Sequence, residues 1–230
     1  WGVLVVGTLM MTSLAPTDIV LPDFIKNSLP TNFQGIGLRW IGLKAMPVAL
    51  VLMMVADVFA RKAEVKNIAI SFFGFIYISI SLSLFYAMRG MFLNSAMSMF
   101  FPNIELMVPI LVIVTVWVND TMAYIVGSFI GRTPISPISP KKTWEGTIAG
   151  VLLSVVLLST VAGQYIPIAT KYLYMITFVA SVMGNLGDLF ESKLKRMAGV
   201  KDSGSMMPGH GGFLDRFDSI LFAGPFVWIL

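Results

Sequence analysis

The sequence predicts an all-α polytopic integral membrane protein. Of its 230 residues 57% are hydrophobic and only 12% are charged, whereas about 25% charged residues is usual for a soluble domain. The mean hydropathy is +0.84. Several apolar runs also approach or exceed the roughly 20 residues that an α-helix needs to cross about 30 Å of hydrocarbon. We therefore expect a bilayer to surround most of the chain.

Seven apolar segments are candidate membrane-spanning helices. Their approximate bounds are 1–14, 46–60, 67–88, 106–130, 146–165, 172–190 and 213–230. The first two are short for a full crossing, and the last reaches the end of the chain. Because the chain opens on Trp1 rather than Met, we expect terminal residues, and further helices, outside this sequence. The prediction is at least seven spans.

The segments form one predicted transmembrane domain, residues 1–230. Residues 1–105 supply N-terminal helices, and residues 106–230 form the half that carries the candidate chemistry. Within the first half, residues 15–45 contain three prolines and three glycines among aromatic side chains. This mixture favours an interfacial or re-entrant segment over a spanning helix.

The distribution of basic residues predicts the orientation, because short cytoplasmic loops of membrane proteins are enriched in Lys and Arg. If the first span runs outward from the cytoplasm, the inner loops hold ten basic residues, namely Arg61, Lys62, Lys66, Arg132, Lys141, Lys142, Lys193, Lys195, Arg196 and Lys201. The outer loops hold five, Lys26, Arg39, Lys44, Arg89 and Lys171. We therefore expect the catalytic loops and helix ends on the cytoplasmic side.

Asp120 is a carboxylate inside an apolar run. It lies about ten residues, or about 15 Å at helical rise, from the inner end of its span. A carboxylate at that depth costs about 2.5 to 3.5 kcal/mol to insert and normally faces a protein interior or a wet cavity. Asn119 and Thr121 flank it, so the alternatives are a helix–helix hydrogen bond or a substrate pocket.

A second polar group closes the sixth span. Asp188, Glu191 and Lys195 are spaced i, i+3 and i+7 and therefore share one helix face. The alternative for Glu191 and Lys195 is an ordinary ion pair at a solvated helix end. Glycines flank Asp188 on the membrane side, which would let a ligand or a neighbouring helix approach closely.

Asp215 and Asp218 are three residues apart at the predicted start of the last helix. They follow a glycine-rich turn that contains His210. One aspartate at a helix N-terminus is commonly a capping device worth about 0.3 to 1 kcal/mol. Two on one face, with Asp188 on the preceding helix, form an oxygen donor set of the kind that holds Mg²⁺ together with substrate phosphate.

Basic residues gather at the same membrane edge, around Lys141 and Lys142 and after the sixth span. Alone, such clusters often set topology or contact anionic lipid headgroups. Beside carboxylates they are typical of phosphoryl or nucleotidyl transfer, where carboxylates hold a metal and cations neutralise phosphate.

These residues resemble a known family. The segment Ser192-x-Leu194-Lys195-Arg196-x4-Lys201-Asp202-x-Gly204-x2-Met207-Pro208-x-His210-Gly211-Gly212-Phe213-x-Asp215-Arg216-Phe217-Asp218 is similar to the phosphatidate cytidylyltransferase, or CDP-diacylglycerol synthase, pattern. Met207 is its one departure, an apolar swap of similar volume. The stretches Asn119-Asp120-Thr121 and Ser139-Pro140-Lys141-Lys142-Thr143-Trp144-Glu145-Gly146 also look like that family. The resemblance covers roughly residues 117 to 218.

The resemblance implies the reaction of CTP with phosphatidate to give CDP-diacylglycerol and pyrophosphate, in phospholipid biosynthesis. It implies metal binding by Asp188, Asp215 and Asp218, and contacts to phosphate and leaving group by Lys195, Arg196, Lys201 and Arg216. The expected substrate-binding set is Asn119, Asp120, Arg132, Lys141, Lys142, Thr143, Glu191, Asp202 and His210. His210 could equally bond locally within its turn, and Asp202 could simply orient Lys201. Mg²⁺ is the expected cofactor, with a second divalent or monovalent cation left open.

The expected partners are CTP, phosphatidate and membrane lipid, with no nucleic acid, and the resemblance suggests a homodimer. We expect the bacterial inner membrane, with the active site facing the cytoplasm. A CTP-dependent polyprenol or lipid kinase is the alternative, since it would need a similar site but release CDP. A cation-coupled transporter would also place carboxylates in the membrane, without consuming CTP.

Overall fold

The computed structural model describes residues 65–89, 104–204, 212 and 214–230, together with isolated positions between 45 and 59. The predicted span 1–14, the interfacial segment 15–45, His210 and most of the span 46–60 lie outside the described residues. The chain divides into two compact units, residues 1–95 and 96–230, which are described separately below.

In the first unit, one run of helix covers the predicted span 67–88. It consists of α4 (Val65–Gly74), a π-helical stretch η2 (Phe75–Ile80) and α5 (Ser81–Ala87). The run is mostly apolar, and Ser79, Ser81 and Ser83 are buried. The Ser83 hydroxyl donates to the Ser79 carbonyl at 2.6 Å. A serine that bonds its own helix backbone loses little by entering an apolar environment.

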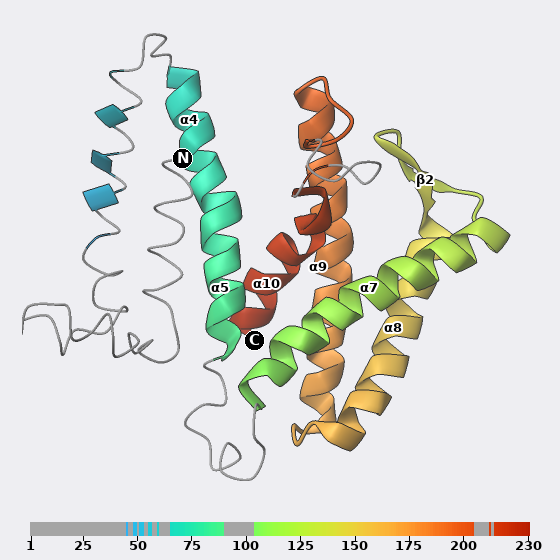
Figure 1. Cartoon of the computed structure of the whole chain (residues 1–230). Coiled ribbons are helices and arrows are strands. Elements are labelled where there is room, and N and C mark those ends of the chain that lie inside the picture. Colours follow the sequence, from blue (N-terminus) through green and yellow to red (C-terminus); the bar gives the residue numbers. More distant parts are fainter. Residues whose placement is uncertain are drawn as a thin grey trace, which may run out of the picture. The chain divides into compact units, whose positions relative to one another are not determined.

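The described part of the second unit is mostly helical and contains one short hairpin. Its elements are α7 (Ile104–Ile130), β1 (Pro134–Ser136), β2 (Ser139–Thr143), α8 (Trp144–Tyr165), α9 (Thr170–Met197), a 3₁₀ turn η4 (Leu214–Arg216) and α10 (Asp218–Ile229). The antiparallel strands pair Pro134 with Thr143 and Ser136 with Ser139. Figure 1 shows the hairpin at the same end of this unit as the C-terminal end of α9.

Three helices among the described residues are long and apolar enough to cross a membrane. They are Leu106–Ile130, Trp144–Tyr165 and Thr170–Met197. Shorter apolar helices cover Phe72–Ala87 and Asp218–Ile229. The chain is thus an integral membrane protein with a mostly helical fold, and the count of at least seven spans stays a prediction. α9 runs seven residues past the predicted 190 because its charged end continues the same helix.

Small residues let the helices of the second unit approach closely. A Cβ atom at Gly150 of α8 would lie 2.8 Å from the Ala123 Cβ and from the Asn119 carbonyl oxygen of α7. A Cβ at Gly187 of α9 would lie 2.7 Å from the Asp218 carbonyl oxygen and 2.9 Å from the Phe222 Cβ of α10. Close backbone approach of this kind is common between membrane helices. It brings the start of α10 against the stretch of α9 that carries Asp188.

Polar side chains pair inside the helix bundle. Ser154 of α8 lies 2.9 Å from Ser181 of α9, and Ser159 lies 2.8 Å from Thr177. All four side chains are buried. A polar group in an apolar interior is costly unless it has a partner, so these hydroxyl pairs favour one register of α8 against α9.

Candidate active site

The hairpin is tied to the start of α8 and to the end of α7. The Thr143 hydroxyl caps α8 by accepting from the Gly146 amide at 3.3 Å. The Glu145 Oε2 accepts from the backbone amides of Arg132 and Thr133, each at 3.2 Å. The first bond satisfies an amide in the first turn of α8, which has no partner within the helix. The other two tie the segment after α7 to α8. As a result Lys141 and Lys142, on β2, are held in a defined place.

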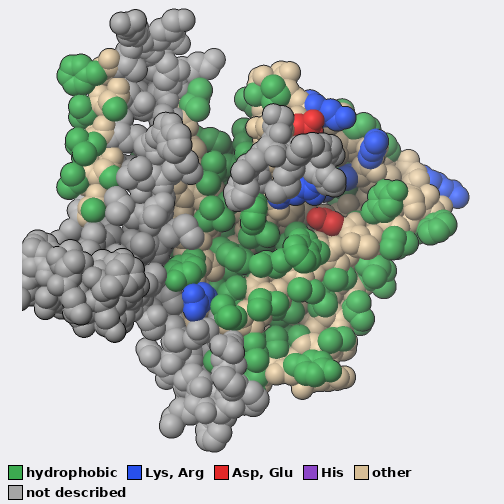
Figure 2. Space-filling view, in the orientation of Figure 1, with side chains coloured by type: hydrophobic (Ala, Val, Ile, Leu, Met, Phe, Trp, Pro, Cys, Tyr) green, Lys and Arg blue, Asp and Glu red, His purple; other side chains and the backbone are tan. Residues whose placement is uncertain are grey.

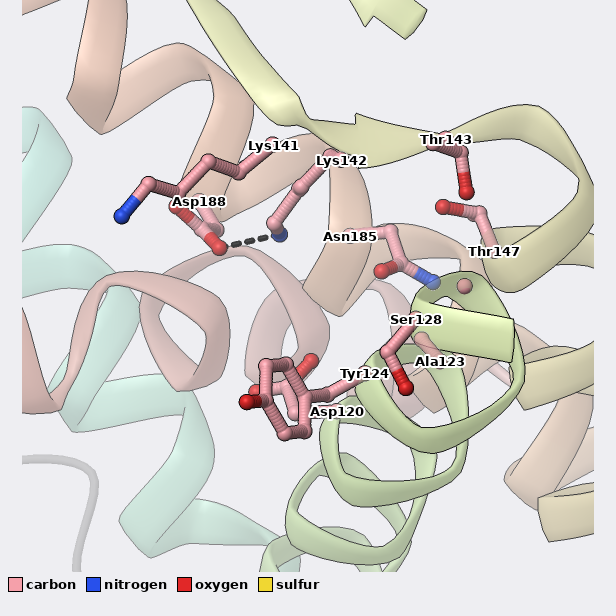
Figure 3. A pocket seen from close by; sticks show the side chains of 11 residues that line it. Asp120, Ala123, Tyr124, Ser128, Lys141, Lys142, Thr143, Thr147, Asn185 and Asp188 are labelled. Carbon is pink, nitrogen blue, oxygen red and sulfur yellow. Dashed lines mark ion pairs between the residues drawn. The ribbon is translucent and has the colours of Figure 1, made fainter. Parts of the chain in front are cut away.

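A pocket of about 580 Å³ opens between α7, β2, α8 and α9. Small-molecule sites commonly have volumes of about 300 to 1,000 Å³. Figure 3 shows a charged part of the pocket around Asp188 and Lys142 and a neutral part around Thr143, Thr147 and Ser128. Its lining residues are Asp120, Ala123, Tyr124, Gly127, Ser128, Lys141, Lys142, Thr143, Thr147, Asn185 and Asp188.

The charged part is built around an ion pair between Lys142 of β2 and Asp188 of α9. Both side chains are only about a quarter exposed, at 26% and 27%. The pair joins the loop after α7 to the C-terminal part of α9, so the two polar segments that follow the fourth and sixth predicted spans meet at one end of this unit. On the face shown in Figure 2, charged side chains of the second unit gather at this end, above a largely hydrophobic surface.

Asp120 lies deeper, within the spanning part of α7, and is accessible from the pocket. Its carboxylate accepts a hydrogen bond from the side-chain amide of Asn119 at 3.2 Å. Asn119 itself is buried, and its side-chain oxygen accepts a hydrogen bond from the side-chain amide of Asn185 on α9 at 3.3 Å. Asn119 thus forms the hydrogen bond between helices, while Asp120 lines the pocket, and the substrate role predicted for Asp120 stays a prediction.

Asp218 belongs to the same electrostatic group. It interacts with Asp188, Lys142 and Asp120, and its Oδ1 accepts from the Ser219 amide at 2.6 Å. Among the described residues, however, no three or more His, Cys, Asp or Glu side chains lie close enough together to hold one metal ion. Mg²⁺ is often held by one or two carboxylates plus water and substrate phosphate, and carboxylate oxygens are its preferred donors. The carboxylates present are of the chemical type that Mg²⁺ prefers, and the metal role predicted for Asp188 and Asp218 stays a prediction.

Asp215 lies in a different environment from Asp188 and Asp218. It accepts from the Lys195 ammonium at 2.7 Å, from the Ser203 amide and hydroxyl at 2.9 Å each, and from the Gly212 amide at 2.6 Å. Partial burial alone raises the pKa of this carboxyl, but the bonds from Lys195 and the two amides outweigh burial and hold the pKa well below its usual range. The metal role predicted for Asp215 stays a prediction. In this structure its oxygens accept hydrogen bonds from Lys195, Ser203 and Gly212.

Lys195 also contacts Glu191, which lies one turn earlier on α9. The Lys195 ammonium is 2.5 Å from the Glu191 Oε2, and the Glu191 side chain is fully buried. The face shared by Asp188, Glu191 and Lys195 thus has two sets of partners. Asp188 pairs with Lys142 at the pocket, while Glu191 and Lys195 lie against Asp215.

Of the remaining predicted cations, Arg132 follows α7, and the others are at the exposed end of α9 and beyond it. The helix ends in a Schellman motif, in which the amide of Val200 donates to the Lys195 carbonyl at 2.9 Å and Gly199 has φ +72°. Arg196 donates to the Val200 carbonyl at 3.3 Å. Arg132, Lys201, Asp202 and Arg216 are exposed and do not line the pocket.

Six pocket residues were not among the predicted site residues. Three carry hydroxyl groups, Tyr124, Ser128 and Thr147, and the others are Ala123, Gly127 and Asn185. A signal for the three hydroxyl residues was present. Tyr124 and Ser128 follow Asp120 at i+4 and i+8, and Thr147 follows Thr143 at i+4, so each group shares a helix face.

Comparison with known proteins agrees with this geometry. The chain is 49% identical over 120 residues to the phosphatidate cytidylyltransferase of Bacillus subtilis, a match that covers 51% of this chain and 44% of that protein. It is 46% identical over 127 residues to the phosphatidate cytidylyltransferase of Synechocystis, covering 54% and 42%. It is 47% identical over 108 residues to the chloroplastic phosphatidate cytidylyltransferase 4 of Arabidopsis thaliana, covering 46% and 27%.

The chain spans less than half the length of each of these relatives. A family model covers far more of the chain, because it matches residues 9–230, which include all of α7 to α10 and the pocket. On this match, the chain belongs to the Cytidylyltransferase family.

Proposed function

We propose that this protein transfers the cytidylyl group of CTP to phosphatidate, which gives CDP-diacylglycerol and pyrophosphate. The observation that carries the proposal is the pocket in which Lys142 of the hairpin pairs with Asp188 of α9, with Asp120 of α7 alongside. The relatives named phosphatidate cytidylyltransferase support the same reaction. A pocket in a membrane helix bundle that combines charged groups with apolar surface suits one water-soluble and one lipid substrate.

The chemistry requires charge neutralisation more than proton transfer. A phosphate monoester has a second pKa near 6, so phosphatidate is largely dianionic at pH 7 and needs no strong general base. Its phosphate oxygen forms a bond to the α-phosphorus of CTP, and the bond from that phosphorus to the β-phosphate oxygen breaks, which releases pyrophosphate. The obstacle is repulsion between two polyanions.

The charged residues of the pocket can reduce this repulsion by neutralising phosphate charge. Lys141 and Lys142 supply ammonium groups at the charged part, where they can contact phosphate oxygens. Asp188, with Asp218 or Asp120, would hold the magnesium ion, which when bound would neutralise phosphate charge. Tyr124, Ser128 and Thr147 supply neutral hydroxyl groups that suit a sugar or glycerol moiety.

The finer topology is part of the proposal. The protein has at least seven spans in the bacterial inner membrane, with the hairpin and the C-terminal end of α9 on the cytoplasmic side, where CTP is available. The excess of Lys and Arg in the predicted inner loops supports this orientation. The homodimer rests on family resemblance alone.

The test follows two labels. CTP labelled at the α-phosphorus, and separately at the γ-phosphorus, is given to purified protein with phosphatidate and Mg²⁺. We expect the α label in a lipid-soluble product, the γ label in pyrophosphate, and one pyrophosphate per lipid product. A γ label in lipid, with release of CDP, would instead identify a lipid kinase. Binding without turnover of CTP would refute both enzymes.

A matched pair of variants ties the activity to the pocket. Lys142→Met removes the pocket ammonium, and Lys171→Met removes an exposed ammonium that stacks on Tyr172 at the start of α9. We expect loss of turnover in the first variant and normal turnover in the second. Equal activity of the two variants would refute the assignment of this pocket.

A further inference from the structure

Glu191 is the only fully buried carboxylate among the described residues. It lies on α9 at the charged end of a helix that otherwise reads as a membrane span. A buried carboxylate is costly unless a counter-charge accompanies it, and breaking such a pair costs more than forming it contributes. Glu191 does not line the pocket, so a role in the pocket does not explain why this carboxylate is buried.

The counter-charge of Glu191 is Lys195. The Lys195 ammonium is 2.5 Å from Glu191 and 2.7 Å from Asp215, and it is 18% exposed. Neither oxygen of Glu191 has a hydrogen bond of good geometry among the described residues, and the side chain lies beside both the Lys195 ammonium and the Asp215 carboxyl. Lys195 is thus held between two carboxylates, one on its own helix and one on the segment before α10.

Asp215 in turn closes the loop that follows α9. Its oxygens accept from the amides of Ser203 and Gly212. Gly212 is buried, and a Cβ atom on it would lie 2.8 Å from the Ser203 carbonyl carbon, so the two ends of this loop are in close contact. The chain of contacts runs from Glu191 through Lys195 and Asp215 to both loop ends.

We propose that Glu191 is a positioning residue, which fixes Lys195 so that Lys195 and Asp215 together hold the loop ends at Ser203 and Gly212. Gly212 lies two residues before η4, and Asp218 is the first residue of α10. In this role Lys195 links α9 to Asp215 and, through it, to Ser203 and Gly212. Contacts to substrate phosphate then come from the pocket residues Lys141 and Lys142. The effect on the reaction rests on the proposed function, whereas the effect on the loop does not.

Glu191→Gln is the test variant, because it keeps the shape of the side chain and removes its charge. Site-resolved amide exchange at Ser203 and Gly212 is measured on the full chain without substrate. We expect exchange about ten- to hundredfold faster, since charge-assisted hydrogen bonds are among the strong ones and their loss opens the structure locally. Exchange within about twofold of the native rate would overturn the proposal.

Glu145→Gln is the matched control. Glu145 holds a different segment of the chain, because it accepts hydrogen bonds from the backbone amides of Arg132 and Thr133 between α7 and β1. We expect this variant to leave exchange at Ser203 and Gly212 unchanged. Equal acceleration in the control would show a general loosening and would overturn the specific role of Glu191.

Kinetics give the second readout. Glu191→Gln is expected to lower kcat by about tenfold or more, with less than about a twofold change in the KM for phosphatidate, because Glu191 touches no substrate in this account. A raised KM with unchanged kcat would contradict positioning and assign Glu191 to substrate contact. If native protein shows no cytidylyl transfer, the proposed function fails while the exchange result still decides the role of Glu191.

A second variant covers the case in which Glu191→Gln does not fold. Glu191→Gln combined with Lys195→Gln removes both charges and leaves no unpaired ion buried. A folded double variant with rapid exchange at Ser203 supports the proposal, and one with native exchange overturns it. Failure of both variants to fold would also overturn it, because Glu191 would then serve the fold as a whole.

Discussion

Gly187→Ala tests whether the close crossing of α9 and α10 sets the spacing of Asp188 and Asp218. The added methyl group would lie 2.7 Å from the Asp218 carbonyl oxygen and 2.9 Å from the Phe222 Cβ, whereas ordinary contacts begin at 3.4 Å. α10 must therefore move by about 0.5 to 0.7 Å to relieve the two contacts. The movement acts directly on Asp218, the first residue of α10.

The expected result is a loss of turnover that exceeds the loss of stability. Overpacking typically costs about 1 to 3 kcal/mol, and Ala in place of Gly returns up to about 1 kcal/mol of helix propensity. A displacement approaching 1 Å at a reacting group can lower the rate by about a hundredfold. We expect kcat to fall about ten- to hundredfold, with only a modest fall in the thermal unfolding temperature, in the labelled-CTP assay and a melting curve on the same preparation.

A graded series of glycines provides the control. A Cβ at Gly163 of α8 meets nothing closer than 3.8 Å, and one at Gly184 of α9 meets the Val116 Cγ2 at 3.2 Å. Activity should therefore decrease in the order Gly163→Ala, Gly184→Ala, Gly187→Ala. If Gly187→Ala is as active as Gly163→Ala, the spacing of α9 and α10 does not control the site.

Three further predictions concern single charges. Asp218→Asn keeps shape and removes charge, and turnover should fall more than tenfold, or 1.4 kcal/mol, at saturating substrates; activity within tenfold would remove Asp218 from metal binding. Lys142→Met should raise the KM for CTP as well as lower kcat, because under the proposed function its ammonium contacts substrate phosphate beside Asp188. A substrate titration of this variant and of Lys171→Met measures the effect. Because the folded pKa of Asp215 is depressed, its stabilising contribution is fully present above its unfolded pKa of about 3.9 and disappears as pH falls toward the folded value. The difference in melting temperature between native protein and Asp215→Asn should thus be constant from pH 5 to 7 and shrink below about pH 4, and a difference that grows on acidification would contradict the assignment.

The long helices could be predicted from the sequence because apolar run length is a local property. The predicted spans 106–130 and 146–165 agree with α7 and α8 to within a few residues. The last helix begins at Asp218 rather than near residue 213, because a 3₁₀ turn at Leu214–Arg216 precedes it. The hairpin was not predicted, since its strands are short and its pairing depends on Glu145 holding the loop from α8.

Part of the pocket lining could be predicted from the sequence, whereas the pairing of its charged groups could not. Residue types and helical spacing placed Asp188 and Lys142 at one membrane edge and Asp120 deeper in its span, and the structure brings all three into one pocket. Spacing alone could not show that Asp188 and Glu191, on the same face, have different partners. Nor could it show that Asp215 bonds Ser203 and Gly212, because those contacts depend on the path of a loop rather than on a periodic pattern.

The most direct test of the account is a density map of the protein with CTP and Mg²⁺ bound. We expect the triphosphate in the pocket beside Lys142, and ion density between Asp188 and one further carboxylate, either Asp218 or Asp120. A triphosphate bound away from Lys142 and Asp188, or Asp188 and Asp218 separated and facing lipid, would contradict the account.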